Sequence, residues 1–160
     1  MPDIKQPTVI GDGCYFGPYS IVWHFTTIGA GCIIGDYVMI GSHCYIGNYT
    51  QIGAESRIQT GVFLPNHTKI AERVFIGPHV CCTDDKYPRV NNHDYLAEPP
   101  IFEQGCSIGA GAVILPGVRI GRMAMVGAGC VVVHDVPDYA VVVGNPSHVI
   151  PSKGEIDAIV

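Results

Sequence analysis

The stretch Ile28–Ile46 reads IGAGCIIGDYVMIGSHCYI, and it repeats one pattern three times. Each unit begins with isoleucine and glycine and carries a cysteine or valine four places after the isoleucine. A period of six does not match the 3.6 residues of a helical turn, but it suits a short strand followed by a tight turn. The stretch therefore predicts a repeating all-β unit.

The same step of six extends in both directions from this stretch. Apolar residues follow it from Ile10 to Ile76, and the series resumes at Phe102 and continues to Val132. Three units make one triangular coil of 18 residues, and successive coils stack as parallel strands at about 4.8 Å. We therefore expect one domain in residues 1–160, with coils at 10–82 and 102–137, a loop at 83–101 and a C-terminal cap at 138–160.

Composition excludes several classes of protein. Charged residues make up only 14% of the 160 residues and hydrophobic residues 48%, which argues against disorder. A net charge of −5 argues against a nucleic-acid binder. The chain has no apolar run of about 20 residues for a membrane span and no signal-peptide layout at its start. We expect a cytoplasmic protein with no membrane partner.

The seven cysteines have no CxxC spacing. Five of them fall on the small inward position of the repeat, where a compact hydrophobic side chain is needed: Cys14, Cys32, Cys44, Cys106 and Cys130. We interpret them as packing residues and expect neither disulfides nor a metal site.

Histidines recur on one side of the predicted coil. His24, His43 and His79 all follow the strand of the third side, and the repeat breaks soon afterwards, at Cys82 and Thr83. We therefore expect a histidine-bearing edge to coincide with the root of the loop, with His79 nearest to it. The alternative is that these are ordinary solvent-exposed turn residues.

The repeat resembles that of the hexapeptide-repeat acyltransferases over residues 10–150. This resemblance implies a left-handed parallel β-helix and a homotrimer with active sites between subunits. It also leaves open a carbonic anhydrase class that shares the fold. That class carries two histidines five residues apart, a spacing that this sequence lacks.

Two segments are similar to a subset of this family that acetylates amino groups of nucleotide-linked amino sugars. Thr83–Arg89 reads TDDKYPR, where the subset has T-N-D-x-x-P-R, and Val22–Phe25 reads VWHF. The resemblance implies a nucleotide-sugar substrate. On it we predict catalytic roles for His79 and Asp84, although Asp84 replaces the usual asparagine. We predict that the substrate is bound by Trp23, His24, Asp85, Tyr87 and Arg89.

The residue before Pro88 indicates the kind of acceptor. Related enzymes that acetylate sugar hydroxyls carry a catalytic histidine there, whereas this chain has Tyr87. A hydroxyl needs a general base, while an amine that is partly neutral near pH 7 is already nucleophilic. The tyrosine therefore favours N-acetylation, although His93, later in the loop, remains an alternative base.

The late coils resemble those along which acetyl-CoA lies in the family. Small turn residues there allow the pantetheine arm to approach backbone amides, although the turn itself also demands glycine. His148 stands where the family has an arginine, and Lys153, or Arg122 of a neighbouring subunit, is a substitute cation. The residues predicted to bind acetyl-CoA are Gly109, Ala110, Gly111, Ala128, Gly129, Asn145 and Pro146.

The sequence thus favours an acetyl-CoA-dependent N-acetyltransferase for a nucleotide-linked amino sugar. Two alternatives stay open. One is O-acetylation of a sugar hydroxyl or another CoA-dependent acyl transfer. The other is a β-helix that transfers no acyl group, either like a γ-carbonic anhydrase or as a structural or binding solenoid.

Overall fold

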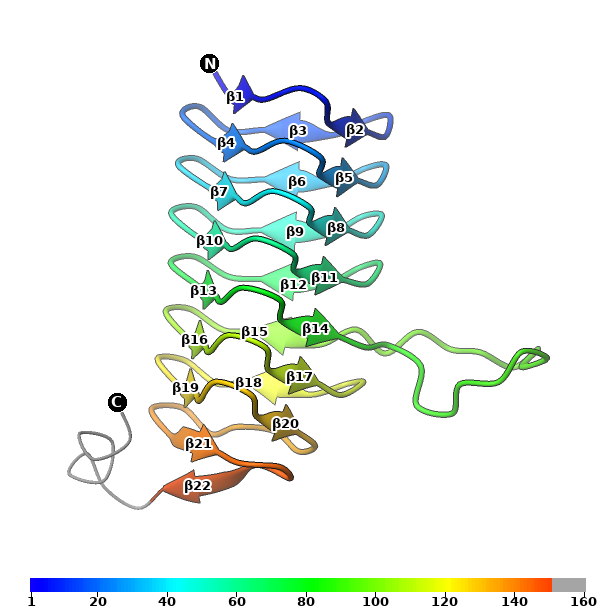
Figure 1. Cartoon of the computed structure of the whole chain (residues 1–160), viewed down its shortest axis with the longest axis vertical. Coiled ribbons are helices and arrows are strands. Elements are labelled where there is room, and N and C mark those ends of the chain that lie inside the picture. Colours follow the sequence, from blue (N-terminus) through cyan, green and yellow to red (C-terminus); the bar gives the residue numbers. More distant parts are fainter. Residues whose placement is uncertain (151–160) are drawn as a thin grey trace.

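The structure is a computed structural model that describes residues 1–150. Within these residues the chain forms short strands and no helix, as the period of six predicts. The strands wind into a stack of triangular coils, and each side of the stack is a mostly parallel sheet (Figure 1). This all-β architecture is the left-handed parallel β-helix expected above.

The strands fall into three sheets. The first contains β1 (Asp3–Ile4), β4 (Ile21–Val22), β7 (Met39–Ile40), β10 (Arg57–Ile58), β13 (Phe75–Ile76), β16 (Ser107–Ile108), β19 (Met125–Val126), β21 (Val141–Val143) and β22 (His148–Ile150). The second contains β2 (Val9–Ile10), β5 (Thr27–Ile28), β8 (Tyr45–Ile46), β11 (Phe63–Leu64), β14 (Cys81–Cys82), β17 (Val113–Ile114) and β20 (Val131–Val132). The third contains β3 (Tyr15–Phe16), β6 (Ile33–Ile34), β9 (Gln51–Ile52), β12 (Lys69–Ile70), β15 (Ile101–Phe102) and β18 (Arg119–Ile120).

The turns between these strands form three edges. Edge 1 joins the first sheet to the second, edge 2 joins the second to the third, and edge 3 joins the third back to the first. The third residue of most turns has a positive φ, as at Gly31, His43 and His79. Its N–H donates to a carbonyl of the preceding coil, as His79 does to Thr60 at 2.9 Å. Each coil is therefore hydrogen-bonded to the next at its corners as well as along its strands.

Large non-glycine residues occupy several of these positive-φ positions. Their side chains are exposed and stack along the edge, as Phe25 does on His43 with ring centroids 5.1 Å apart. Tyr49 and His67 stack in the same way on edge 2, at 5.2 Å. The left-handed conformation costs a residue with a Cβ about 1–2 kcal/mol, and stacking offsets part of that cost. The edges thus carry side chains of varied chemistry without disturbing the coil.

The interior of the stack is one continuous apolar core. Ile34, Ile58 and Ile108 have no exposed surface, in agreement with the predicted inward positions. Four cysteines are buried at the small inward position: Cys32, Cys44, Cys106 and Cys130. Burial raises the pKa of the Cys106 thiol to about 12, so this cysteine is a packing group rather than a nucleophile at neutral pH.

One insertion interrupts the coils. β14 ends at Cys82 and β15 begins at Ile101, and the segment between them projects sideways from edge 2 (Figure 1). The stack continues beyond it, because Phe75 of β13 pairs directly with Ser107 of β16. The predicted coincidence of the histidines with the loop root is wrong. The histidines occupy edge 1, and β14 forms a complete side of the triangle between edge 1 and the loop.

The two ends of the described stack differ. β1 pairs with β4, so the coils begin before Ile10. At the other end β21 and β22 form an antiparallel pair in which Val142 faces Val149. These strands lie in the segment assigned above to a cap, and its remaining residues, 151–160, lie outside the described part. No helix in residues 1–150 has the length and apolar character needed to cross a membrane.

Candidate functional site

A strip that carries no side chain larger than a methyl group runs along edge 1 in the coils of β16 and β19. Ala110, Gly111, Ala128 and Gly129 are all exposed there. Three other glycines at the third turn position are covered by a side chain of the next coil, as Gly61 is by the ring of His79. Apart from each glycine's own chain neighbours, no atom of residues 1–150 lies within 4 Å of the point where a Cβ would stand on Gly111 or Gly129. We call residues 109–111 and 127–129 the bare strip.

The bare strip also presents backbone donors. The N–H groups of Ala110 and Ala128 donate to no acceptor in residues 1–150. At the same turn position on edge 2, the N–H of Ala30 donates to the Asn48 side chain at 2.8 Å. On edge 3 the N–H of Arg122 donates to Asp138 at 2.9 Å. Alanine supplies no such acceptor on the strip, so a ligand carbonyl can take that place.

His79 lies one coil from the bare strip on the same edge. The N–H of Gly111 donates to the Pro78 carbonyl at 2.8 Å, which joins the two turns directly. The His79 side chain is exposed, and its ring makes no hydrogen bond within residues 1–150. The ring lies over Gly61 of the preceding coil, on the side away from the strip, so His79 reaches a molecule on the strip only after its side chain rotates.

The other residues predicted on edge 1 lie farther away. His24 and Trp23 belong to the turn after β4, four coils from Gly109 or about 19 Å at the usual strand spacing. Nδ1 of His24 donates to the Gln6 carbonyl at 2.6 Å, so its ring is anchored to the first turn of the stack. Trp23 is 40% exposed and offers a flat apolar surface at that end.

The loop holds a second group of predicted residues. The Tyr95 hydroxyl donates to Oδ2 of Asp84 at 2.6 Å. This hydrogen bond raises the pKa of Tyr95 to about 12, because ionisation would bring a phenolate against the carboxylate. Oδ1 of Asp85 accepts the N–H of Tyr87 at 2.8 Å. Both carboxylates thus have partners inside the loop.

The tip of the loop is open to solvent. Tyr87 is 69% exposed, and among the described residues the Arg89 guanidinium donates only to the neighbouring Pro88 carbonyl, at 2.8 Å. A hollow of about 500 Å³ is lined here by Asp85, Pro88, Arg89 and Val90. The predicted substrate-binding residues Asp85, Tyr87 and Arg89 therefore do lie together, but on edge 2 rather than on edge 1.

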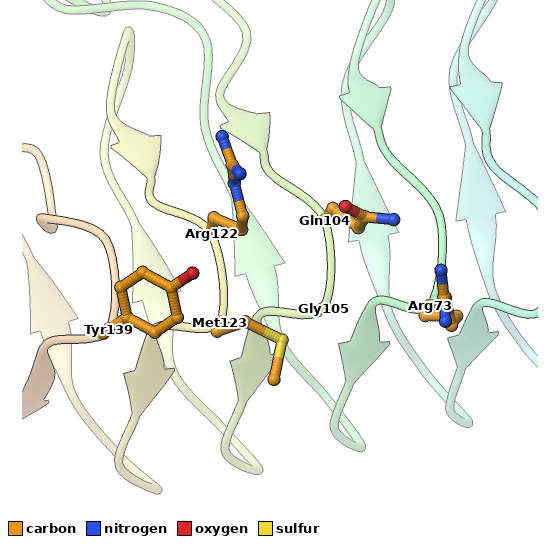
Figure 2. A pocket seen from close by; sticks show the side chains of 6 residues that line it. All are labelled: Arg73, Gln104, Gly105, Arg122, Met123 and Tyr139. Atoms are coloured by element: carbon orange, nitrogen blue, oxygen red, sulfur yellow. The ribbon is translucent and has the colours of Figure 1, made fainter.

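A further hollow lies on edge 3 (Figure 2). It measures about 450 Å³ and is lined by Arg73, Gln104, Gly105, Arg122, Met123 and Tyr139. It exists because Gly105 has no side chain where neighbouring coils carry large ones. Arg122, weighed above as a substitute cation for acetyl-CoA, thus lies on a different edge from the bare strip of its own chain. Lys153, the other candidate, lies outside the described residues.

The structure brings together some of the predicted residues and separates others. His79 adjoins the bare strip, and Asn145 and Pro146 follow along the same edge beyond β21. The loop group stands one side of the triangle away. Residues that the sequence analysis missed are Tyr95 and Glu98, which hold the loop through contacts that follow no period. In residues 1–150 no three His, Cys, Asp or Glu side chains gather as a metal site would require.

Comparisons with known proteins agree with this architecture. The family model described as bacterial transferase hexapeptide (six repeats) matches residues 7–42, 26–60 and 99–134. A curated relative from Staphylococcus aureus, 2,3,4,5-tetrahydropyridine-2,6-dicarboxylate N-acetyltransferase, is 52% identical over 60 residues. That match covers 38% of this chain and 25% of the relative, so the chain spans about a quarter of that protein's length.

Solved structures resemble the whole coil stack. PerB from Caulobacter crescentus, in complex with CoA and GDP-perosamine, has a TM-score of 0.59 at 23% identity, covering 93% of this chain and 56% of PerB. A hexapeptide-repeat acetyltransferase from Vibrio cholerae has a TM-score of 0.56 at 25% identity, covering 86% of this chain and 73% of that one. The family-model matches extend over more than half of the sequence, and the chain belongs to the bacterial transferase hexapeptide family.

Proposed function

We propose that this chain is an acetyl-CoA-dependent N-acetyltransferase that acts on the amino group of a nucleotide-linked amino sugar. The observation that carries the proposal is the bare strip, with two backbone N–H groups that have no acceptor in residues 1–150, next to the turn that carries His79. The N-acetyltransferase name of the Staphylococcus aureus relative supports the reaction class.

The bare strip suits the pantetheine arm of acetyl-CoA. That arm is narrow and carries two amide groups and a thioester carbonyl, which need hydrogen-bond donors. The N–H groups of Ala110 and Ala128 supply such donors, and Gly111 and Gly129 leave room for the arm to reach them. Asn145 and Pro146 would contact the end of the ligand nearer the C-terminus. The CoA in the PerB structure is consistent with this assignment.

The reaction needs little from side chains. The acceptor amine attacks the thioester carbonyl carbon, a C–N bond forms, and the C–S bond breaks as the CoA thiolate leaves. The amine gives up one proton, which His79 or water takes, and the thiolate is protonated. A backbone N–H of the strip would stabilise the negative charge that develops on the carbonyl oxygen.

We assign binding of the acceptor to the loop. Lys86 and Arg89 are both exposed near its tip and suit the phosphates of a nucleotide, and Tyr87 offers a ring for the sugar or the base. Because the loop leaves edge 2 and the strip lies on edge 1, one chain does not bring them together. We therefore propose a homotrimer in which the loop of one subunit meets edge 1 of its neighbour.

Release of free thiol from acetyl-CoA tests the function directly. We expect release with at least one UDP-, GDP- or dTDP-linked amino sugar and none with the matching sugar that carries a hydroxyl in place of the amine. Tetrahydropyridine dicarboxylate should be included, because it is the acceptor of the Staphylococcus aureus relative. Thiol release with the hydroxyl sugar alone would favour O-acetylation. No release with any acceptor would contradict the proposal.

Replacing His79 with asparagine tests how much the reaction depends on a base. We expect kcat to fall about tenfold with little change in the KM for acetyl-CoA, because an amine acceptor needs less base catalysis than the 10²–10⁴-fold typical of general bases. His43→Asn, two coils away on the same edge, is the matched control and should leave kcat unchanged. A fall of about 10³-fold in His79→Asn would indicate that a hydroxyl is acetylated instead.

A further inference from the structure

The two arms of the loop are joined at its base. Asp84 on the outgoing arm accepts the Tyr95 hydroxyl through its side chain at 2.6 Å and the N–H of Glu98 through its carbonyl at 2.8 Å. The carbonyl of Glu98 then accepts the N–H of Gly117 at 2.7 Å, which anchors the returning arm to the next coil. We call Asp84, Tyr95 and Glu98 the loop brace.

The tip of the loop depends on this brace for its position. Residues 86–91 and 93–96 are exposed, and the large apolar side chains Val90 and Leu96 are 102% and 78% exposed. The tip therefore has no apolar core to fix it. Its internal contacts are local, as between the N–H of Asn92 and the Arg89 carbonyl at 3.3 Å. Such contacts set the shape of the tip but not its direction relative to the coils.

The side chain of Asp84 is already engaged. One oxygen accepts a phenol hydroxyl at short distance, and the residue lies on edge 2, a full side of the triangle from His79 and the bare strip. In its own chain Asp84 thus stands away from the proposed reacting atoms. In a trimer the loop would approach a neighbouring subunit, and there the hydrogen bond to Tyr95 would still occupy an oxygen that a catalytic role would use.

We propose that Tyr95 and Asp84 are positioning residues, whose hydrogen bond directs the loop tip so that Tyr87 and Arg89 meet the acceptor. The expected change in the KM for the acceptor rests on the proposed function, whereas the loop brace itself is independent of the reaction. The bond needs an oxygen acceptor at residue 84 and a hydroxyl at residue 95. It does not need a negative charge, because an asparagine oxygen also accepts.

Four variants test the brace: Tyr95→Phe, Asp84→Ala, Asp84→Asn and the control Tyr139→Phe. The first two remove the bond, and Asp84→Asn keeps an acceptor. Tyr139 is an exposed tyrosine on edge 3, outside the loop. Two quantities are measured on each full-length protein: amide hydrogen exchange of residues 86–98, and the KM values for acetyl-CoA and for the amino-sugar acceptor.

We expect Tyr95→Phe and Asp84→Ala to speed exchange across 86–98 and to raise the acceptor KM about tenfold, a typical effect of losing one hydrogen bond to a charged group. The KM for acetyl-CoA should stay unchanged, and Asp84→Asn should remain within about threefold of the parent. Tyr139→Phe should match the parent in both measurements.

Two results would overturn the brace. The first is unchanged exchange and unchanged acceptor KM in Tyr95→Phe. The second is an Asp84→Asn variant as inactive as Asp84→Ala while Tyr95→Phe stays active, which would make Asp84 a catalytic carboxylate. If the parent protein transfers acetyl to no acceptor, the proposed function fails, and hydrogen exchange alone still decides whether the brace orders the loop.

Discussion

Replacing Gly129 with histidine is expected to abolish acetyl-CoA binding while leaving the fold intact. The substitution suits the backbone, because Gly129 has a φ of 69° and histidine occupies the same turn position at His43 and His79, with φ of 59° and 58°. The ring should lie over Gly111, as the ring of His79 lies over Gly61. It would then fill the bare strip and block the amides of Ala110 and Ala128.

The expected size of this effect is large. Denying the ligand its two backbone donors and the surface between them should raise the Kd for acetyl-CoA at least about 100-fold, since each lost hydrogen bond contributes about 1 kcal/mol and steric exclusion adds to it. The stability cost should be about 1–2 kcal/mol, because a Cβ is placed in the left-handed conformation. Isothermal titration calorimetry with acetyl-CoA and a thermal melt measure the two quantities separately.

Gly13→His is the matched control. Gly13 has a φ of 72° and lies on edge 2 in the first full coil, and the described part of the chain places nothing within 4 Å of its Cβ point. It should pay the same conformational cost without touching the strip. Equal acetyl-CoA affinity in Gly129→His and Gly13→His would show that acetyl-CoA does not bind along residues 109–129.

Replacing Ile58 with alanine is expected to lower the free energy of unfolding by several kcal/mol, about 2–5 for a buried isoleucine. Ile58 is fully buried in β10, in the middle of the first sheet, and its strand pairs with both β7 and β13. Removing a buried isoleucine typically destabilises by about 2–5 kcal/mol, because the packed walls of the interior do not collapse into the cavity. Denaturant unfolding followed by circular dichroism measures the loss.

The neighbouring residue on the same strand supplies the control. Arg57 points outward from β10 and is exposed, so Arg57→Ala should change stability by no more than about 0.5 kcal/mol. Both variants need the same protein concentration, since assembly into oligomers adds concentration-dependent stability. A cost below about 1 kcal/mol for Ile58→Ala would mean that the interior of the stack is loosely packed at this coil.

The fold could be predicted from the sequence because the inward-facing apolar residues recur every six positions. Ile34, Ile58 and Ile108 lie where the period puts them, since a parallel stack forces every coil into the same register. The position of the bare strip follows for the same reason. Runs of glycine and alanine at known turn positions leave the edge uncovered.

The period of six stops at the loop, so the sequence does not predict the contacts that residues of the loop make. The contact between Asp84 and Tyr95 joins residues eleven apart in a segment with no repeat, and nothing in either residue type predicts the pairing. The edge from which the loop emerges was misjudged for a simpler reason. The prediction ends the coils at residue 82 but takes no account of the side of the triangle that Cys81 and Cys82 add after the turn of His79. Cys82 is fully buried in β14, and Cys81 pairs with Phe63.

Because the coils keep a constant register, the distance between two residues on one edge is a whole number of coil spacings. Trp23 and Gly109 share one edge, and every coil between them contributes one step of about 4.8 Å. Deleting residues 41–58 would remove one complete coil and join Ile40 to Gln59, with all three turn types preserved. The gap between the aromatic end and the bare strip can therefore lengthen or shorten only in whole steps. Insertion or deletion of whole coils during evolution would therefore change the distance between Trp23 and the bare strip in fixed increments.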